Sequence, residues 1–456
     1  MSEAMTEALF PPCVMPRPPA APLSLPRYLL RFIRNPLSVM PQTVYEEPIV
    51  QHGRRTWVTD PALVKTILLD KRESFPKTGI EARVFGGLLG QGILIAEDAA
   101  WRWQRQAAAP IFRHADILQY VPPMAQAAER LIALWGASPP GALQPIDRQM
   151  TEITFDVIAE TMLAGARGAR GSGLERVNGD YMRPLAWPLL WAILHLPRTL
   201  AFPGKRRHVA AEKAMRESVA AIVSTRRSKD FHSDLLQRLL KARDPDSGQL
   251  MNDRQVTDNL LTFLLAGHET TARSLAWALY LLSLSPKWQV RLLREVQATV
   301  GNAELSGTHV DRLPLITAFM KETMRLYPPI SSISRVADCD IVLGDKMITK
   351  GSLVIIPMFA IHRHRKLWRD PERFDPARFH GGEEAKLARY QYMPFGAGPR
   401  VCIGASFSMT ESVVMLASFV RAARFTTPAG RRFNPVSGIS LRARPDIELN
   451  VCIRNG

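Results

Sequence analysis

The chain is poor in cysteine: its 456 residues include only Cys13, Cys339, Cys402 and Cys452. Four cysteines at such wide spacings are too few for the disulfide framework that stabilises many secreted domains. A reducing cytoplasm therefore fits the sequence best, and we expect the three cysteines other than Cys402 to be ordinary thiols. No internal repeat is evident either, which argues against a solenoid or another repeat architecture.

Long basic runs and an apolar N-terminal segment are also lacking. The formal net charge is +17, yet the longest basic run is Lys205-Arg206-Arg207 and no nucleic-acid-binding module is recognisable, so we predict no nucleic-acid partner. Seven prolines within the first 26 residues exclude a signal-peptide core and a membrane span there. We expect residues 1–40 to form an irregular Pro-rich arm, and we expect no transmembrane segment.

What the chain does contain is an unusual loop around Cys402. The segment from Phe395 to Gly404 reads F-x-x-G-x-R-x-C-x-G, with glycines at 396, 398 and 404 that allow a positive φ and a close backbone approach. Helical spacing of apolar residues over Ala405 to Val420 predicts a helix that begins directly after it. The positive end of that helix should lower the pKa of the thiol. The loop therefore suits a thiolate held against a metal, although most single cysteines in Gly-rich turns are simply buried.

The length of this pattern makes a chance match improbable, and it resembles the haem-binding loop of the cytochrome P-450 monooxygenases. In that family the cysteine is the axial thiolate ligand of the iron in haem b (iron protoporphyrin IX). The resemblance assigns that role to Cys402. It further implies that Phe395 packs beside the sulfur, that Arg400 reaches a haem propionate, and that Gly404 borders the cofactor.

A second motif interrupts a stretch, Leu260 to Leu284, that is apolar on nearly every side. Gly267 costs about 1 kcal/mol against alanine in a helix interior, which suggests that something needs the space. The segment from Ala266 to Thr271 resembles the A-G-x-E-T-T pattern of the family's central helix. The resemblance implies that Gly267 borders the haem, that Thr270 hydrogen-bonds the bound dioxygen, and that Glu269 helps to bring protons in.

The alternative for this segment is a helix that breaks near Gly267 and leaves Glu269 solvated. For His268 we expect packing or exposure to solvent rather than metal ligation.

A third motif places Glu322 and Arg325 at positions i and i+3 of one helix. Alone this is a common surface pair of little energetic value. With Pro376-Ala377-Arg378-Phe379 it resembles the family's E-x-x-R and P-x-R-F motifs, whose second arginine completes a buried structural triad. Residues 371–374 match the same letters, but the copy with Arg378 has the expected distance to the cysteine loop, so Arg378 is our predicted third member.

Two further segments resemble the family's contacts with the haem propionates. Trp101 and Arg105 match a W-x-x-x-R helix, and Arg335 leads into a strand after the E-x-x-R helix. Asp98-Ala99 stands where relatives often have a glycine, which predicts a different approach of the chain to the first of these helices.

Length alone would suggest about three domains. The four motifs span residues 101 to 404, however, and all must meet at one haem. We therefore predict a single haem-binding domain over residues 41–456 with the cytochrome P-450 fold, mainly α with smaller β-sheets (α+β). Strand signals lie at residues 47–59, around 344–345 with 352–357, and at 439–453.

The resemblance implies a monooxygenase that uses O2 to hydroxylate or epoxidise a hydrophobic small molecule such as a fatty acid, terpenoid or aromatic compound. Only 52 residues follow Gly404, so we expect electrons from a separate ferredoxin or flavodoxin with its reductase. A basic patch of Arg102, Arg363, Arg365 and Lys366 would attract such an acidic donor.

Two alternatives stay open at this point: a peroxide-driven peroxygenase, and a non-enzymatic haem-thiolate sensor or ligand carrier. The Glu269-Thr270 pair weighs against both of them.

The substrate is not identified by any motif, but local composition marks candidate segments. Residues 181–202 are unusually apolar and are predicted either to cover the pocket, with weak contact to a membrane surface, or to be ordinary core. The segment 330–334, which has three serines, and the turn 436–439, which has one, are further candidates for the pocket lining, because small hydroxyl side chains leave room for a ligand.

Overall fold

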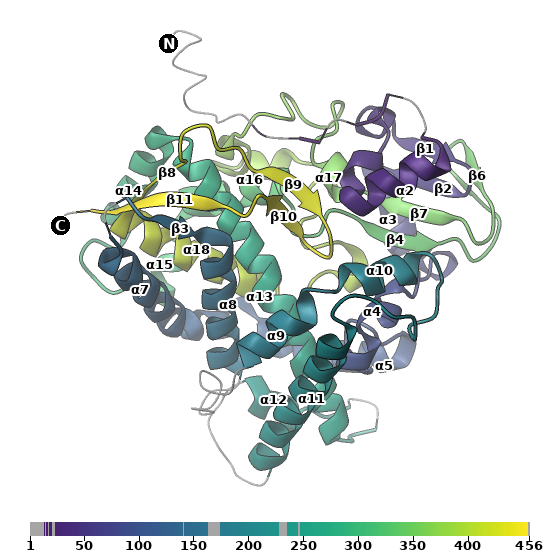
Figure 1. The fold of residues 1–456 in the computed structure, drawn as a ribbon, viewed down its shortest axis with the longest axis horizontal. Helices are drawn as coiled ribbons and strands as arrows, with labels where there is room; N and C mark the ends of the chain where they lie inside the picture. The colour runs from purple at the N-terminus through teal and green to yellow at the C-terminus, as the bar shows by residue number, and fades with distance from the viewer. Residues whose placement is uncertain are drawn as a thin grey trace.

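The computed structural model describes residues 13, 15–16, 18–20, 23–139, 141–162, 174–227, 235–244 and 247–454. Helices dominate these residues, and the strands form small sheets at the periphery (Figure 1). The predicted mainly α fold with smaller β-sheets is confirmed.

The helices divide into two groups at the longest of them, α13. Before it come α2 (Leu25–Arg34), α3 (Pro61–Lys65), α4 (Ile80–Leu89), α5 (Asp98–Ala108), α6 (His114–Ile117), α7 (Val121–Ala137), α8 (Ile146–Met162), α9 (Leu174–Met182), α10 (Ala186–Ile193), α11 (Lys205–Arg227) and α12 (Leu235–Lys241). The second group is α13 (Asp253–Ser283), α14 (Pro286–Thr299), α15 (Gly307–Val310), α16 (Pro314–Leu326), α17 (Met358–Ile361) and α18 (Ala405–Ala422).

The largest sheet has the strand order β1-β2-β7-β4, with β1 (Ile49–His52), β2 (Arg55–Val58), β4 (Ile333–Val336) and β7 (Leu353–Ile356). Strands β2 and β7 pair in parallel, with Thr56 opposite Val354, and the other pairs are antiparallel. A second sheet joins β3 (Leu143–Pro145), β11 (Glu448–Ile453) and β8 (Ala423–Thr426). Two hairpins pair β5 (Ile341–Leu343) with β6 (Lys346–Ile348) and β9 (Asn434–Ser437) with β10 (Leu441–Arg444). Each segment with a predicted strand signal thus contains strands.

Helix α13 runs through the middle of the molecule and is buried over most of its length (Figure 1). It begins with a capping box, in which the Asn252 side chain accepts a hydrogen bond from the Gln255 N–H and the Gln255 side chain accepts one from the Asn252 N–H. The helix is continuous through Gly267, so the alternative of a break at that residue is wrong. Helix α8 packs along it, which buries both faces of the pair in one apolar core.

The N-terminal segment corrects one prediction, because residues 25–34 form helix α2 and the arm is not irregular throughout. Pro26 lies in the first turn, where the missing N–H of proline costs no helical hydrogen bond. Just after the helix, the Asn35 amide donates to the Pro435 carbonyl and accepts from the Ser437 N–H.

The first twelve residues lie outside the described part of the chain. None of the helices that the structure describes is both long and apolar enough to span a membrane.

Candidate cofactor and active site

The loop before α18 is closed by a hydrogen bond from the Cys402 N–H to the Phe395 carbonyl, 2.9 Å long. Gly396 and Gly398 have φ angles of 72° and 70°, which favour glycine. A side chain on Gly398 would also lie 2.6 Å from the Leu68 carbonyl oxygen. The loop therefore needs its glycines, and Gly404 directly precedes α18 as expected.

The thiol of Cys402 is accessible to solvent, although protein surrounds it on most sides. Loss of surrounding water raises the pKa of the Cys402 thiol, while a hydrogen bond from the Gly404 N–H and the positive charge of Arg105 lower it. The net direction is upward. The predicted lowering of the thiol pKa is thus wrong for the protein chain on its own, because desolvation outweighs both favourable contributions.

Three arginines predicted to meet the haem propionates gather around this loop. Arg105 on α5 donates to the Val401 carbonyl at 2.7 Å, next to Cys402. Arg400 donates to the Ala96 carbonyl at 2.8 Å, and Arg335 on β4 donates to the Ser334 carbonyl at 2.8 Å. Partial burial lowers the pKa of each guanidinium, and repulsion from Arg335 and Arg105 lowers that of Arg400 further.

The ring of Trp101 makes a cation–π contact with this group of arginines. The guanidinium of Arg400 lies 4.0 Å from the ring centroid. Helix α5 begins at Asp98, whose φ angle is +46°. This left-handed backbone favours glycine, and Asp98 belongs to the Asp98-Ala99 pair at which the sequence predicts a different approach to the helix.

The residues present fit a haem. Among the described residues no group of three or more His, Cys, Asp or Glu side chains could hold a metal ion, whereas a porphyrin needs only one protein ligand to its iron. Glu97 and Glu81 are the acids whose charges offset Arg335, and Glu97 also pairs with Arg400 at 3.2 Å. Three mutually repelling, half-buried cations beside one thiol suit a cofactor that carries carboxylates.

On α13 the side chain of Ala266 is exposed, although the helix around it is buried. The Thr270 hydroxyl donates to the Ala266 carbonyl at 2.8 Å. One residue further on, Thr271 Oγ1 lies 3.0 Å from Ser408 Oγ of α18, which fixes this part of α13 to the helix that follows the cysteine loop.

Glu269 points to a different set of partners. Its carboxylate accepts a hydrogen bond from Ser440 Oγ at 2.7 Å and lies 3.6 Å from the guanidinium of Arg273. Arg273 in turn donates to Asp147 on α8 at 2.7 Å. Within the described residues no hydrogen bond joins Glu269 to Thr270, so a direct proton relay between them is absent from this arrangement.

The other two residues of the motif serve the packing of α13. A Cβ on Gly267 would lie 2.4 Å from Cδ1 of Ile158, so the missing side chain makes room for α8. His268 is buried, with Nδ1 2.7 Å from the Leu264 carbonyl and Nε2 3.0 Å from the Asn178 amide. The prediction that His268 packs rather than ligates a metal agrees with these contacts.

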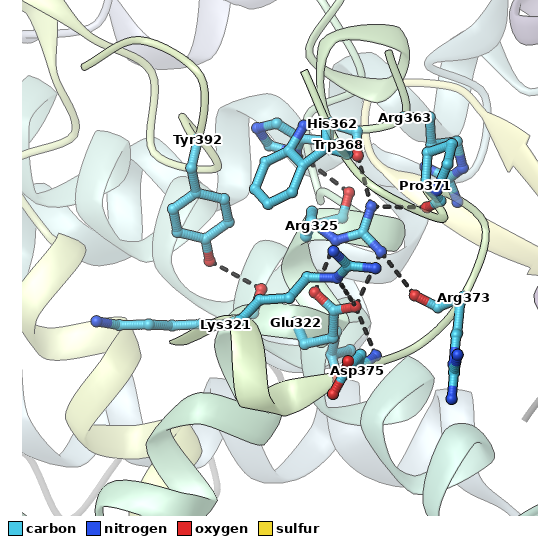
Figure 2. A network of polar contacts seen from close by, with 12 residues as sticks. Lys321, Glu322, Arg325, His362, Arg363, Trp368, Pro371, Arg373, Asp375 and Tyr392 are labelled. Carbon is cyan, nitrogen blue, oxygen red and sulfur yellow. Dashed lines mark hydrogen bonds and ion pairs between the residues drawn. The ribbon is translucent and has the colours of Figure 1, made fainter. Parts of the chain in front are cut away.

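The structure brings the predicted triad of Glu322, Arg325 and Arg378 together, and Figure 2 shows the Glu322–Arg325 pair. Glu322 and Arg325 are fully buried and form a bidentate pair with N to O distances of 2.7 and 2.8 Å. Arg378 Nε lies 3.6 Å from the Glu322 carboxylate. Arg373, the alternative in the sequence, contributes its backbone carbonyl to Arg325 instead, at 3.0 Å.

Sequence reasoning missed His362, which links this triad to the cysteine loop (Figure 2). Its Nδ1 donates to the Arg325 carbonyl at 3.2 Å, and its Nε2 accepts from the N–H of Met393, two residues before Phe395. Burial, together with the charges of Arg325 and Arg363, lowers the pKa of His362 to about 3. A histidine beside two cationic residues in the sequence offered no signal of this role.

The predicted basic patch does not exist as proposed. Arg363 is fully buried, 3.8 Å above the ring of Phe359, and pairs with Glu372. Arg365 and Lys366 are exposed but form ion pairs with Glu46 and Glu47. Arg102, on α5, is exposed, and no ion pair joins it to another of the described residues.

The predicted substrate segments lie as follows. Residues 181–202 include α10, which packs on α4, and the Arg83 side chain donates to the Leu196 carbonyl at 2.9 Å. Trp187, Leu194 and Leu200 on this segment are exposed, so ordinary core packing does not describe all of it. The segment 330–334 and the turn 436–439 are joined by a hydrogen bond of 2.7 Å between Ser331 and Ser437.

Cys402 lies in a glycine-rich loop, and the arginines beside it can pair with two carboxylates. This is the arrangement of a haem-thiolate protein. Comparison with known proteins identifies the family. The family model of cytochrome P450 matches residues 49–450. A cytokinin hydroxylase of Arabidopsis thaliana is 31% identical over 87% of this chain and 78% of its own length. Cyclooctat-9-en-7-ol 5-monooxygenase of Streptomyces melanosporofaciens is 30% identical over 84% of this chain and 80% of its own.

Solved structures agree. The crystal structure of the cytochrome P450DA heme domain is similar with a TM-score of 0.80 and 26% identity, covering 89% of each chain. That of the cytochrome P450 CYP102L1 has a TM-score of 0.76 and 24% identity over 88% of this chain and 89% of its own. The chain therefore belongs to the cytochrome P450 family. Members of this family bind haem through a cysteine thiolate and act as monooxygenases, which confirms the resemblance seen in the sequence.

Proposed function

We propose that this chain is a cytoplasmic monooxygenase that hydroxylates or epoxidises a hydrophobic small molecule such as a fatty acid, terpenoid or aromatic compound. Its electrons come from a separate ferredoxin or flavodoxin with its reductase. The observation that carries the proposal is the exposed thiol of Cys402 with Arg105, Arg335 and Arg400 around it. The names of the Arabidopsis and Streptomyces relatives describe oxidations of small organic molecules, which supports the substrate class.

The bound haem supplies the activation of O2 and the insertion of oxygen. In this proposal the thiolate of Cys402 would hold the haem iron, Phe395 and Gly404 would border the sulfur, and the arginines would neutralise the propionates. Trp101 supports Arg400 by stacking on its guanidinium.

Thr270 is the proposed proton donor, and it must first change its hydrogen bond. Its O–H is directed at the Ala266 carbonyl, so Oγ1 can accept a hydrogen bond, but the hydroxyl cannot donate one elsewhere until it rotates. Glu269 is the proposed source of the proton that reaches Thr270, and its carboxylate is bound to Ser440 and Arg273. We propose that a water molecule, or a movement of the Glu269 side chain, connects the two groups.

Thr270→Ala therefore tests the function. With a ferredoxin system and a substrate that changes the spin state of the haem, we expect electron consumption to continue while product falls and hydrogen peroxide accumulates. Thr270→Ser, which keeps the hydroxyl, is the matched control and should retain most product.

Equal coupling in the Ala variant and the wild type would remove Thr270 from the reaction. Product formation with hydrogen peroxide alone, and none with the ferredoxin system, would establish the peroxygenase alternative instead. Binding of hydrophobic compounds with no product from either source would establish the sensor or carrier.

A further inference from the structure

A second site lies on the face of α13 that is turned toward α8. A hollow of about 640 Å³ is lined by residues of α8, α9, α11 and α13. Its polar lining includes Arg148, Arg176, Arg183, Arg207, Asn178 and His268. None of these residues belongs to the cysteine loop or to the cluster of arginines beside it.

The charge of this hollow is positive. Besides the four arginines it is lined by two acids, Glu152 and Asp180, so four positive and two negative charges leave a net charge of +2. Glu152 pairs with Arg148 at 3.3 Å. Within the described residues, Arg176, Arg183 and Arg207 make no ion pair, and all three are exposed. Three cations directed into one hollow from three segments provide the donors that an oxyanion requires.

The floor of the hollow contains a polar atom that lacks a partner. Because a carbonyl only accepts, Nδ1 of His268 must carry the proton that it shares with Leu264, and Nε2 then accepts from the Asn178 amide N–H. The other amide atom of Asn178, Oδ1, is buried and makes no hydrogen bond with any described residue. A buried acceptor without a donor is costly, so a ligand whose O–H or N–H group reaches Asn178 Oδ1 would gain a hydrogen bond there.

We propose that this hollow binds a small oxyanion that carries a hydroxyl group, of which phosphate at neutral pH is the simplest example. Its charged oxygens accept hydrogen bonds from Arg176, Arg183 and Arg207, and its hydroxyl donates to Asn178 Oδ1. Arg176 lies on α9, Arg183 directly follows α9 within the 181–202 segment, and Arg207 lies in the first turn of α11, after that segment. A bound anion would link both ends of that segment to α13 beside Glu269, which makes this an effector site separate from the haem.

Calorimetric titration of the haem-loaded full chain with phosphate and with sulfate, at constant ionic strength and pH 7, tests the proposal. Sulfate matches phosphate in shape but carries no proton at this pH. We expect saturable binding of both anions, with phosphate the tighter. Arg207→Gln should weaken both by about tenfold, since it removes hydrogen bonds to a charged group.

Arg206→Gln is the matched control, because Arg206 is the neighbouring exposed residue on α11 and does not line this hollow. Asn178→Ala should abolish the preference for phosphate while leaving sulfate binding largely intact. Absence of saturable binding, or equal losses in the Arg206 and Arg207 variants, would overturn the proposal. Persistence of the phosphate preference in Asn178→Ala would also overturn it. Because the readout is binding, these outcomes are independent of the proposed monooxygenase reaction.

Discussion

At the scale of single residues, the site depends on groups whose ordinary chemistry is changed by their surroundings. The thiol of Cys402 has lost part of its surrounding water, Arg400 is repelled by two other cations, and burial keeps His362 neutral. Each such group favours one protonation state, and each therefore makes the stability of the fold depend on pH or on a bound charge.

His362 provides the clearest dependence on pH. Its pKa is about 3 in the folded chain, below its value of 6.5 for the unfolded group, so the unfolded chain binds the proton more readily. The contribution of His362 to stability is present above pH 6.5 and is lost as pH falls toward 3. Between pH 7.5 and pH 5 we expect a loss of about 2 kcal/mol in the free energy of unfolding.

Urea unfolding of the wild type and of His362→Gln across this pH range measures the effect. Glutamine can still form one of the two hydrogen bonds of His362 but does not titrate in this range. The free energy of unfolding of the variant should therefore fall by about 2 kcal/mol less than that of the wild type between pH 7.5 and pH 5. Parallel curves would show that His362 titrates normally in the fold.

Asp98 permits a test of backbone geometry. At an ordinary helical position alanine is more stable than glycine by about 1 kcal/mol. At the φ of +46° found for Asp98 the order should invert, because a Cβ is disfavoured there. In thermal or urea unfolding we expect the free energy of unfolding of Asp98→Gly to be about 1 kcal/mol higher than that of Asp98→Ala. Both variants remove the same charge, so the charge does not affect this comparison. The usual order, alanine above glycine, would contradict the left-handed start of α5.

At the scale of secondary structure elements, α13 is the element around which the others are placed. It packs on α8 through Gly267, it is joined to α18 through Thr271 and Ser408, and it is joined to the β9–β10 turn through Glu269 and Ser440. The helix thus positions Thr270 relative to Cys402 although no bond connects those two residues directly.

The contact between α13 and α8 can be tested by a double-mutant cycle. Gly267→Ala places a Cβ 2.4 Å from Cδ1 of Ile158, and we expect this crowding to destabilise the fold by about 1–3 kcal/mol, partly offset by the helix propensity of alanine. Ile158→Val removes that Cδ1 atom. When Gly267→Ala is added to the Ile158→Val variant, it should therefore be neutral or stabilising, with a coupling energy of about 1–2 kcal/mol. Additive effects of the two substitutions would show that Gly267 serves a purpose other than this contact.

Elements with strong local signals were predictable from sequence, whereas long-range contacts were not. The apolar spacing of α13 and α18 and the turn at Gly344 gave correct elements, because their patterns are local. The pairing of Arg365 with Glu46 joins residues more than 300 positions apart, and Arg363 is buried only in the folded chain, so composition alone placed these cations on an open surface. The purpose of Gly267 was missed for the same reason, since Ile158 is its partner only in the folded chain.

At the scale of the whole molecule, residues from the four motifs and from β4 converge on one region. Arg105 comes from α5, Arg335 from β4 and Arg400 from the loop before α18, while the Glu322–Arg325 pair supports that loop through His362. Segments with no common local role thus meet around a single thiol, and the proposed function depends on that thiol being the ligand of haem.

The spectrum of the ferrous carbon monoxide complex tests this claim most directly. We expect the wild type and Cys339→Ala, a control at another exposed cysteine, to show the spectrum characteristic of thiolate ligation, and Cys402→Ala to lose it. A thiolate spectrum that persists in Cys402→Ala, or that is absent from the wild type with haem bound, would contradict the assignment of Cys402 as the ligand.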